Sequence, residues 1–309
     1  MGIKNQKQYV LVLLTIFFLV LSSFARETGY LHERYVEQEL NQEEKPVFVK
    51  EESRRKGGLI GFYIKGGVGF VDSGDFNNLV KGYRDYSSAA DYYINWPELG
   101  LMMEFGAEIL LNFTQNIGFG IGAGYIMKNN VGEYGSQDPS YQVDYDREYG
   151  FSVIPISGNL HIRFLTTRLF GFSINGGVDY LLGNITHTYT FQSSSGSSTR
   201  REEVKCNTIG YHGGISIDIN FSSRVSLVLE GSYRFADFKD WKGSVDSPDT
   251  GNFDGELYYY EYESAYYDEY YPRMWVWSGA PSASYYRNVR LARINLSGFS
   301  STLGIKINF

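Results

Sequence analysis

The last residues of the chain alternate strictly between apolar and polar side chains. Leu303, Ile305, Ile307 and Phe309 fall on one face of an extended strand, whereas Gly304, Lys306 and Asn308 fall on the other. This period of two predicts a strand with two unlike faces. Because the sequence stops at Phe309, we expect no further element to cover the apolar face.

The first 25 residues have the pattern of a secretory signal peptide. Lys4 and Lys7 supply a positive start, residues 9–21 form an apolar core, and Ser23 and Ala25 are small residues before a predicted cut. An uncleaved membrane anchor is the alternative. Residues 26–56 are rich in Glu and Arg and are expected to form a charged periplasmic arm, either flexible or carrying one short helix.

Composition leaves two all-β classes open. The 309 residues include 35 Gly, 27 Tyr and 21 Phe, and after the N-terminus no apolar run approaches the roughly 20 residues that a membrane helix needs. A transmembrane β-barrel has such a composition because only alternate residues face lipid. A soluble β-sandwich can have the same composition. The lengths of the connections between strands are therefore needed to distinguish the two folds.

Alternating segments predict eight strands. They cover approximately residues 59–71, 99–113, 117–125, 154–164, 170–182, 209–221, 225–235 and 294–309. Pro155 indicates a bulge or a strand end. Ile294 and Leu296 are out of phase with residues 303–309, which predicts a second bulge near Gly298 and Phe299.

Short and long connections alternate between these strands. Residues 114–116, 166–168 and 222–224 are short turns, whereas four longer segments separate the remaining strands, the longest being residues 237–288. Outer-membrane barrels show this asymmetry, with short periplasmic turns and long external loops. We therefore predict an all-β fold, an eight-stranded antiparallel up-and-down transmembrane β-barrel over residues 57–309.

The pattern of residues 57–309 resembles the small eight-stranded outer-membrane barrels typified by the OmpA transmembrane domain, OmpX and OmpW. The resemblance implies a place in the bacterial outer membrane, contact with its lipid, and recognition by the barrel-assembly machinery. In that class the insertion signal is a C-terminal Phe with apolar residues two, four and six places earlier, here Phe309, Ile307, Ile305 and Leu303. Two departures from the class are expected: no peptidoglycan-binding domain after the barrel, and an unusually long fourth loop.

Polar residues on the inward faces form a candidate lumen network. Two interpretations are open: a polar path for small solutes, or a set of paired charges that fills the interior, because eight strands enclose little more than the space that side chains fill. The set is Lys65, Glu104, Glu108, His161, Arg163, Asp179, His212, Asp218, Glu230, Arg234 and Lys306.

The residues indicate no enzyme, metal or cofactor. A membrane lipid-modifying enzyme would need a nucleophile or water beside a His and an orienting carboxylate, and no local arrangement of this kind is evident. Cys206 has no possible disulfide partner in the chain. A fragment with calcium-loop spacing, from Thr250 to Glu261, has Thr in the first ligand position and is treated as coincidence.

The predicted extracellular loop at residues 237–288 is unusually rich in aromatic side chains. Such loops suit recognition of an external partner, although the same rings could instead pack on one another above the membrane. The candidate residues are Tyr258, Tyr259, Tyr260, Tyr266, Tyr267, Tyr270, Tyr271, Trp275 and Trp277. We expect a structural or surface-recognition protein, with a narrow channel and a lipid-modifying enzyme as alternatives; no nucleic-acid partner is expected.

Overall fold

The computed structural model describes residues 59–89, 92–136, 143–167, 169–193, 196–222, 224–263 and 270–309. These residues belong to one compact unit, Arg55–Phe309. The predicted signal peptide at residues 1–25 and the predicted arm at residues 26–56 lie outside the described residues.

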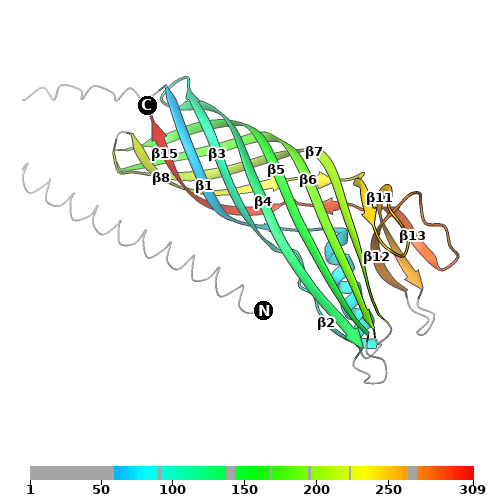
Figure 1. Ribbon diagram of the computed structural model, residues 1–309. Coiled ribbons are helices and arrows are strands. Elements are labelled where there is room, and N and C mark those ends of the chain that lie inside the picture. The colour runs from blue at the N-terminus through cyan, green and yellow to red at the C-terminus, as the bar shows by residue number, and fades with distance from the viewer. Residues whose placement is uncertain are drawn as a thin grey trace, which may run out of the picture. The chain divides into compact units, whose positions relative to one another are not determined.

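Eight strands form a closed antiparallel ring (Figure 1). Each strand pairs with its neighbour in the chain, and the last strand pairs with the first, so the ring has no free edge. This is the predicted eight-stranded up-and-down β-barrel. Its strands are β1 (Ile60–Val71), β3 (Leu101–Asn112), β4 (Ile117–Ser136), β5 (Val143–Thr166), β6 (Phe170–Ser193), β7 (Gly196–Asn220), β8 (Val225–Phe235) and β15 (Gly298–Asn308).

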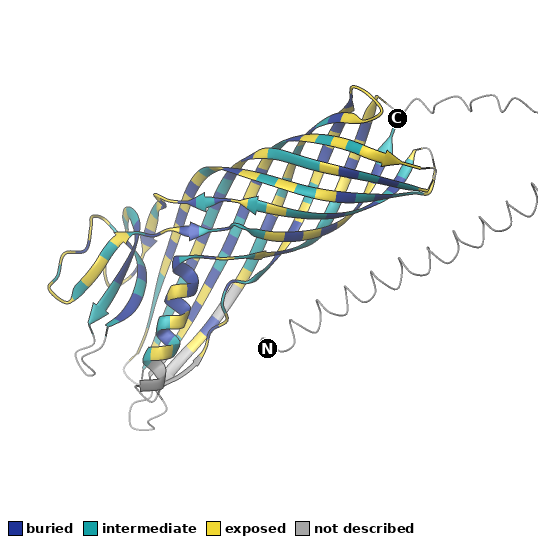
Figure 2. Cartoon of the chain, turned by 180° about the vertical axis from the view of Figure 1, so that it is seen from behind, coloured by how far each residue is buried: buried dark blue, intermediate teal, exposed yellow. Residues whose placement is uncertain are grey.

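Large apolar side chains cover the outside of the ring, and Figure 2 shows exposed and buried residues alternating along its strands. On β15 this apolar band covers eleven residues, from Phe299 to Phe309, which gives a height of about 25 Å for a tilted strand. Aromatic rings border the band at both ends. They include Phe113, Phe164, Phe221 and Phe309 near the short turns, and Tyr125, Tyr180, Tyr211, Tyr233, Phe235 and Phe299 at the other end.

An exposed apolar band with aromatic borders is the surface that a bilayer solvates, so the ring is a transmembrane barrel. The described residues contain no helix that is long and apolar enough to cross a membrane.

Strands β4 to β7 continue past the apolar band, where their outward side chains become polar: Asn129, Ser152, Asn184 and Lys205. They support further elements that we call, together with these strand extensions, the headpiece. It includes α2 (Asp75–Ala89), β2 (Tyr92–Asn95), β9 (Asp237–Phe238), β10 (Lys242–Asp246), β11 (Phe253–Glu263), β12 (Tyr270–Trp277), β13 (Tyr286–Leu291) and β14 (Ile294–Asn295).

The headpiece sheet is joined to the barrel by strand pairing with β7 (Figure 1). β10 pairs with β7, β11 pairs with β10, and both β12 and β13 pair with β11. β2 pairs antiparallel with the end of β4, and β9 and β14 form a separate two-stranded sheet. The long fourth loop is therefore a folded layer joined to the barrel by backbone hydrogen bonds.

Helix α2 lies in the segment that follows β1, one of the four longer connections, in which no helix was predicted. Phe76, Leu79, Val80 and Tyr83 recur at helical spacing, and all four are buried. The Asn77 side-chain amide accepts from the Leu99 backbone N–H at 3.0 Å and donates to the Leu99 carbonyl at 3.1 Å. These contacts hold the start of the helix against the entry to β3.

One apolar core closes the headpiece end of the barrel. Met102, Ile126 and Leu181 point inward from ring strands, and they belong to the same buried cluster as Phe76 and Trp241 of the headpiece. Removing this much apolar surface from water is strongly favourable, at roughly 25 cal/mol per Å². The barrel interior therefore ends beneath a packed hydrophobic layer.

Both predicted bulges are wrong. β5 runs through Pro155 in constant register with β6, because the missing N–H affects only the β4 side, where the ladder is interrupted between Ile156 and Val153. β15 keeps one register with β1 from Gly298 to Asn308. Ile294 and Leu296 are out of phase with β15 because they are buried in the headpiece core. A register shift does occur in β5, between Arg163 and Leu165.

If the apolar band lies in the bilayer, a charged residue on the outer face should lower the free energy of unfolding most near the middle of the bilayer. Leu160→Arg, near the middle of the band on β5, should lower the free energy of unfolding in lipid vesicles by about 2–4 kcal/mol. Thr186→Arg is the matched control, because Thr186 is exposed on β6 beyond the band and should cost less than about 1 kcal/mol. Urea titration followed by the heat-shifted gel band measures both; equal costs would contradict the proposed band.

Candidate functional site

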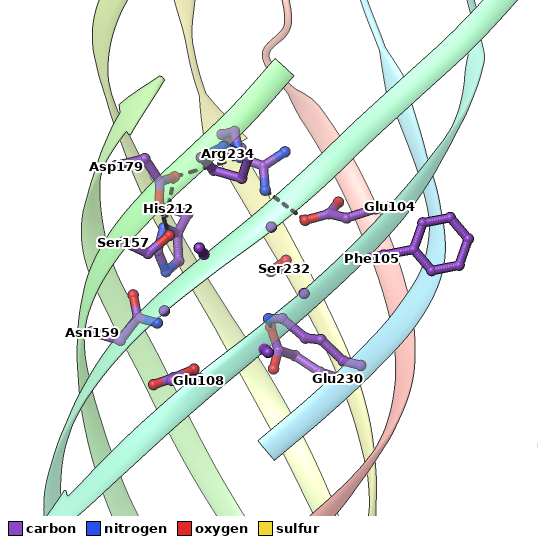
Figure 3. A pocket seen from close by; sticks show the side chains of 17 residues that line it. Glu104, Phe105, Glu108, Ser157, Asn159, Asp179, His212, Glu230, Ser232 and Arg234 are labelled. Atoms are coloured by element: carbon purple, nitrogen blue, oxygen red, sulfur yellow. Dashed lines mark hydrogen bonds and ion pairs between the residues drawn. The ribbon is translucent and has the colours of Figure 1, made fainter. Parts of the chain in front are cut away.

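All eleven residues of the candidate lumen network lie on inward faces of the ring strands. Figure 3 shows the middle of this set, with Glu104, Glu108, Asp179, His212, Glu230 and Arg234 converging from β3, β6, β7 and β8. Every member contacts an oppositely charged or hydrogen-bonding partner on another strand of the ring.

Arg234 joins two carboxylates in the layer nearest the headpiece. Its guanidinium donates to Glu104 Oε1 at 2.7 Å and lies 3.5 Å from Asp179 Oδ2. The same Asp179 oxygen is 2.9 Å from His212 Nδ1, and the Ser157 hydroxyl donates to the other oxygen of Asp179. Five strands, β3, β5, β6, β7 and β8, are thus linked through one arginine and one aspartate.

The next layers toward the short turns repeat this pairing. Lys65 Nζ is 2.8 Å from Glu230 Oε1, and His161 Nε2 is 2.7 Å from Glu108 Oε1. Lys306 forms an ion pair with Asp218.

Arg163 lies closer to the short turns and donates to Asn112 Oδ1 at 2.9 Å. Buried charges persist when they are paired and hydrogen-bonded, and this arrangement supplies both conditions.

Glycines on β4 leave the space that the charged side chains occupy. A Cβ on Gly120 would lie 1.5 Å from Glu108 Oε1, and one on Gly177 of β6 would lie 2.4 Å from Asn159 Oδ1. The close approach of Glu108 to His161 therefore requires a residue without a side chain at position 120.

Little empty space remains in the lumen. Two cavities of about 40 Å³ and 20 Å³ lie within the network, enough for roughly three water molecules and one water molecule respectively. Both cavities lie below the hydrophobic layer of the headpiece.

Several candidate recognition residues are buried instead of exposed. Tyr259, Tyr260 and Tyr271 are at most 8% exposed, and Tyr258 is 9% exposed. Tyr271 stacks on Tyr86 of α2, so these rings hold the headpiece together. Tyr266 and Tyr267 lie outside the described residues.

Trp275 also packs inside the headpiece, against two arginine side chains. Its ring lies 4.5 Å from the Arg200 guanidinium and 5.8 Å from that of Arg147. This orientation was not predictable from the sequence, because the partners on β5 and β7 are distant in the chain.

Aromatic rings that remain partly exposed gather where β11, β12 and β13 meet. Tyr285 is 44% exposed, and its ring packs against Tyr286 and Tyr262. We call this group, together with Trp277, Tyr270 and Arg287, the aromatic patch. Arg287 stacks 3.6 Å from the Tyr270 ring and forms an ion pair with Glu261. Tyr285, Tyr286 and Arg287 were not among the predicted recognition residues.

A buried polar cluster in the headpiece was also missed. His187 Nδ1 is 3.0 Å from Glu202 Oε2, and the other Glu202 oxygen accepts from Arg200 at 2.7 Å and from the Val276 backbone N–H at 3.2 Å. Arg200 also donates to the Val276 carbonyl. These side chains satisfy the otherwise free edge of β12 and fasten it to the β6–β7 hairpin.

Burial and neighbouring charges determine the protonation of this cluster. Burial lowers the pKa of His187, the nearby arginines lower it further, and Glu202 opposes them only partly. Burial alone would raise the pKa of Glu202, but His187 and Arg200 together bring it below its ordinary value. The cluster is therefore most stable with a neutral imidazole and a charged carboxylate.

The residues of the predicted assembly signal point away from the barrel interior. Leu303, Ile305 and Phe309 are 50%, 53% and 73% exposed, and Ile307 is partly exposed on the same face. Within the described part of the chain, no three His, Cys, Asp or Glu side chains converge closely enough to hold a metal ion. Cys206 is buried.

No protein-family model matches the chain, and no curated protein matches it in sequence. Among solved structures it is similar to Neisserial surface protein A, at 8% identity over 80% of this chain and 97% of that one, with a TM-score of 0.28. It is also similar to the outer membrane protein OprG from Pseudomonas aeruginosa, at 14% identity over 82% and 97%, with a TM-score of 0.35. A third similar structure is the outer membrane protease OmpT from Escherichia coli, at 10% identity over 82% and 95%, with a TM-score of 0.24.

These likenesses concern the fold alone. The closed ring of eight strands, the apolar exterior and the charged interior give the chain the fold of the small eight-stranded outer-membrane β-barrels.

The glycine at position 120 gives a steric prediction. Gly120→Ala should displace Glu108 from His161 and lower the free energy of unfolding by about 1–3 kcal/mol, the range for overpacking a filled interior. Gly231→Ala on β8 is the control, because no atom lies within 4 Å of its added Cβ. Similar unfolding midpoints for the two variants would contradict the filled lumen.

The headpiece should be sensitive to mild acid. His187 has a lowered pKa in the folded state, so the unfolded headpiece binds the proton more readily, and stability is lost as the pH falls below about 6.5. The protection factors of β12 amides against hydrogen exchange, which correct for the slower intrinsic exchange at lower pH, should fall between pH 7 and pH 5.5. His187→Gln should remove this loss of protection; an equal loss in the variant would assign it to another group.

Proposed function

We propose that this protein is a closed outer-membrane barrel that carries a rigid headpiece for recognition at the cell surface. In this proposal the short turns lie in the periplasm, the headpiece lies outside the cell, and the barrel-assembly machinery reads the C-terminal strand. Outer-membrane lipid contacts the apolar band. The aromatic patch is the contact surface for an external partner.

The observation that carries the proposal is the continuous hydrophobic core between barrel and headpiece. Ring residues such as Met102 and Leu181 share that core with Trp241 and Val276. A loop that only connected two strands would not need such a core. The core fixes β11 and β12 on the barrel, and β13 pairs with β11. The aromatic patch is therefore held in one geometry, and little entropy is lost when a partner binds.

The aromatic patch has the composition of a binding surface. Tyr and Trp offer large contact area with few rotatable bonds, and Arg adds a hydrogen-bonding fork that stacks on aromatic rings. Tyr285 and Tyr286 contact each other edge to face, and Tyr286 also packs beside Trp277. Arg287 is 53% exposed at this surface.

The channel and enzyme alternatives have weaker support. For passage of solutes, the ion pairs of the lumen and the hydrophobic layer above them would both have to open. For catalysis, Ser157 donates to Asp179 and not to His212, so the described contacts do not pair its hydroxyl with an imidazole base. We therefore propose a role without catalysis.

Site-specific photo-crosslinking on intact cells tests the surface role. A crosslinking amino acid in place of Tyr285 should yield a discrete adduct with an external partner. The same amino acid in place of Lys205, which is exposed on the outer face of β7 away from the patch, should not. Adducts at neither position, or equally at both, would contradict recognition by the aromatic patch.

A further inference from the structure

One arginine of the headpiece has no carboxylate partner among the residues that the structure describes. Arg273 lies on β12, and the strongest electrostatic contributions at its guanidinium come from the tyrosines Tyr83, Tyr260 and Tyr271. Other arginines of the headpiece each form an ion pair, in the pairs Arg200–Glu202, Arg287–Glu261 and Arg290–Asp75. Arg273 therefore differs from them in lacking an acidic partner.

The guanidinium of Arg273 is also incompletely hydrogen-bonded. One of its terminal nitrogens donates to the Tyr271 hydroxyl, but its Nε is buried and has no hydrogen-bond partner. The guanidinium carbon lies 4.4 Å from the centre of the Tyr262 ring and 5.1 Å from that of the Tyr271 ring. These rings stabilise a cation, but they offer no acceptor in the plane of the Nε–H. A buried N–H group needs such an acceptor.

The tyrosines around Arg273 do not neutralise its charge. Burial raises the pKa of Tyr260 and that of Tyr271 above the ordinary value. Both hydroxyls are therefore uncharged at neutral pH. The positive charge of Arg273 remains uncompensated, and a partly buried charge of this kind favours a partner of opposite sign.

Arg273 lies on the same face of the headpiece sheet as the aromatic patch. Strand pairing places Arg273 opposite Tyr260 and Tyr262 opposite Tyr286 (Figure 1). Cross-strand partners share a face, as do residues two apart on one strand. The Tyr262 ring contacts the Arg273 guanidinium as well as the rings of Tyr285 and Tyr286. One ring thus separates Arg273 from the exposed Tyr285.

We propose that Arg273 is an anion-binding residue at the base of the aromatic patch, and that the external partner places a carboxylate of an acidic peptide segment on its guanidinium. A carboxylate brings the single negative charge that Arg273 lacks and accepts charge-assisted hydrogen bonds from the guanidinium. A phosphate monoester carries about 1.5–2 negative charges, more than one arginine compensates. Tyrosine, tryptophan and arginine together are typical of contacts with protein partners. The peptide assignment rests on the proposed surface role, whereas the anion site itself does not.

Anion-dependent stability of the full chain in lipid vesicles tests the site without a partner. Sodium acetate is compared with sodium chloride at equal ionic strength and pH 8. An anion that binds only the folded state should raise the unfolding midpoint by roughly 3–6 °C per tenfold increase in acetate above its dissociation constant. Because salts also act on stability by exclusion from the protein surface, the decisive quantity is the difference between wild type and Arg273→Gln. Equal acetate responses in these two proteins would overturn the site.

Two substitutions and a control variant make this comparison specific. Arg273→Gln and Arg273→Met should both lose the acetate response, so one variant that fails to fold does not end the test. Arg201→Gln removes an equal charge from the exposed outer face of β7 and should retain the wild-type response. A larger response to sodium phosphate than to sodium acetate would overturn the carboxylate assignment in favour of a phosphate ligand.

Photo-crosslinking on intact cells connects the site to the partner. With the crosslinking amino acid in place of Tyr285, Arg273→Gln should reduce the yield of the external adduct at least tenfold, because a charge-assisted contact is lost. An undiminished adduct in Arg273→Gln would overturn the carboxylate contact and leave surface recognition standing. No adduct with Arg273 present would instead contradict the proposed function, and the acetate response would still decide whether the anion site exists.

Discussion

The hydrocarbon core of a bilayer offers no water to a free strand edge, so every backbone group in this region must find its partner in the chain. The pairing of β15 with β1 closes the ring and meets that requirement. Closure also fixes the side-chain pattern, because alternate residues then face either lipid or a narrow interior. The apolar exterior, the paired charges inside and the glycines of β4 all follow from these two faces.

Beyond the membrane the same strands obey a different rule. Water surrounds the extensions of β4 to β7, so their outward residues are polar and their inward residues, such as Tyr149 and Val153, are apolar. Along each of these strands the membrane part has apolar residues outside and polar residues inside. The extension has the reverse pattern, as in a soluble sheet. The headpiece fills the inner face of these extensions, and its core closes the barrel.

Sequence alternation was sufficient to predict the eight ring strands and their order. Each lipid-facing position must be apolar, whatever other segments of the chain lie near it. The inward residues of the lumen network were found in the same way. The strand extensions were missed because their apolar residues face a core made of distant segments. Helix α2 had a visible signal, the spacing of Phe76, Leu79, Val80 and Tyr83, within a segment of polar composition. The tyrosines of β11 were predicted to contact an external partner because the loop is rich in aromatic residues. Composition could not show that these rings are instead buried inside the headpiece.

Single-channel recording of the refolded protein in a planar bilayer tests the central claim that the barrel is closed. A heat-shifted gel band first establishes that the barrel has folded. We expect no discrete conductance steps, because ion pairs fill the lumen and an apolar core covers it. Reproducible steps whose size changes on replacement of Glu104 or Arg234 would show an open polar path and contradict it.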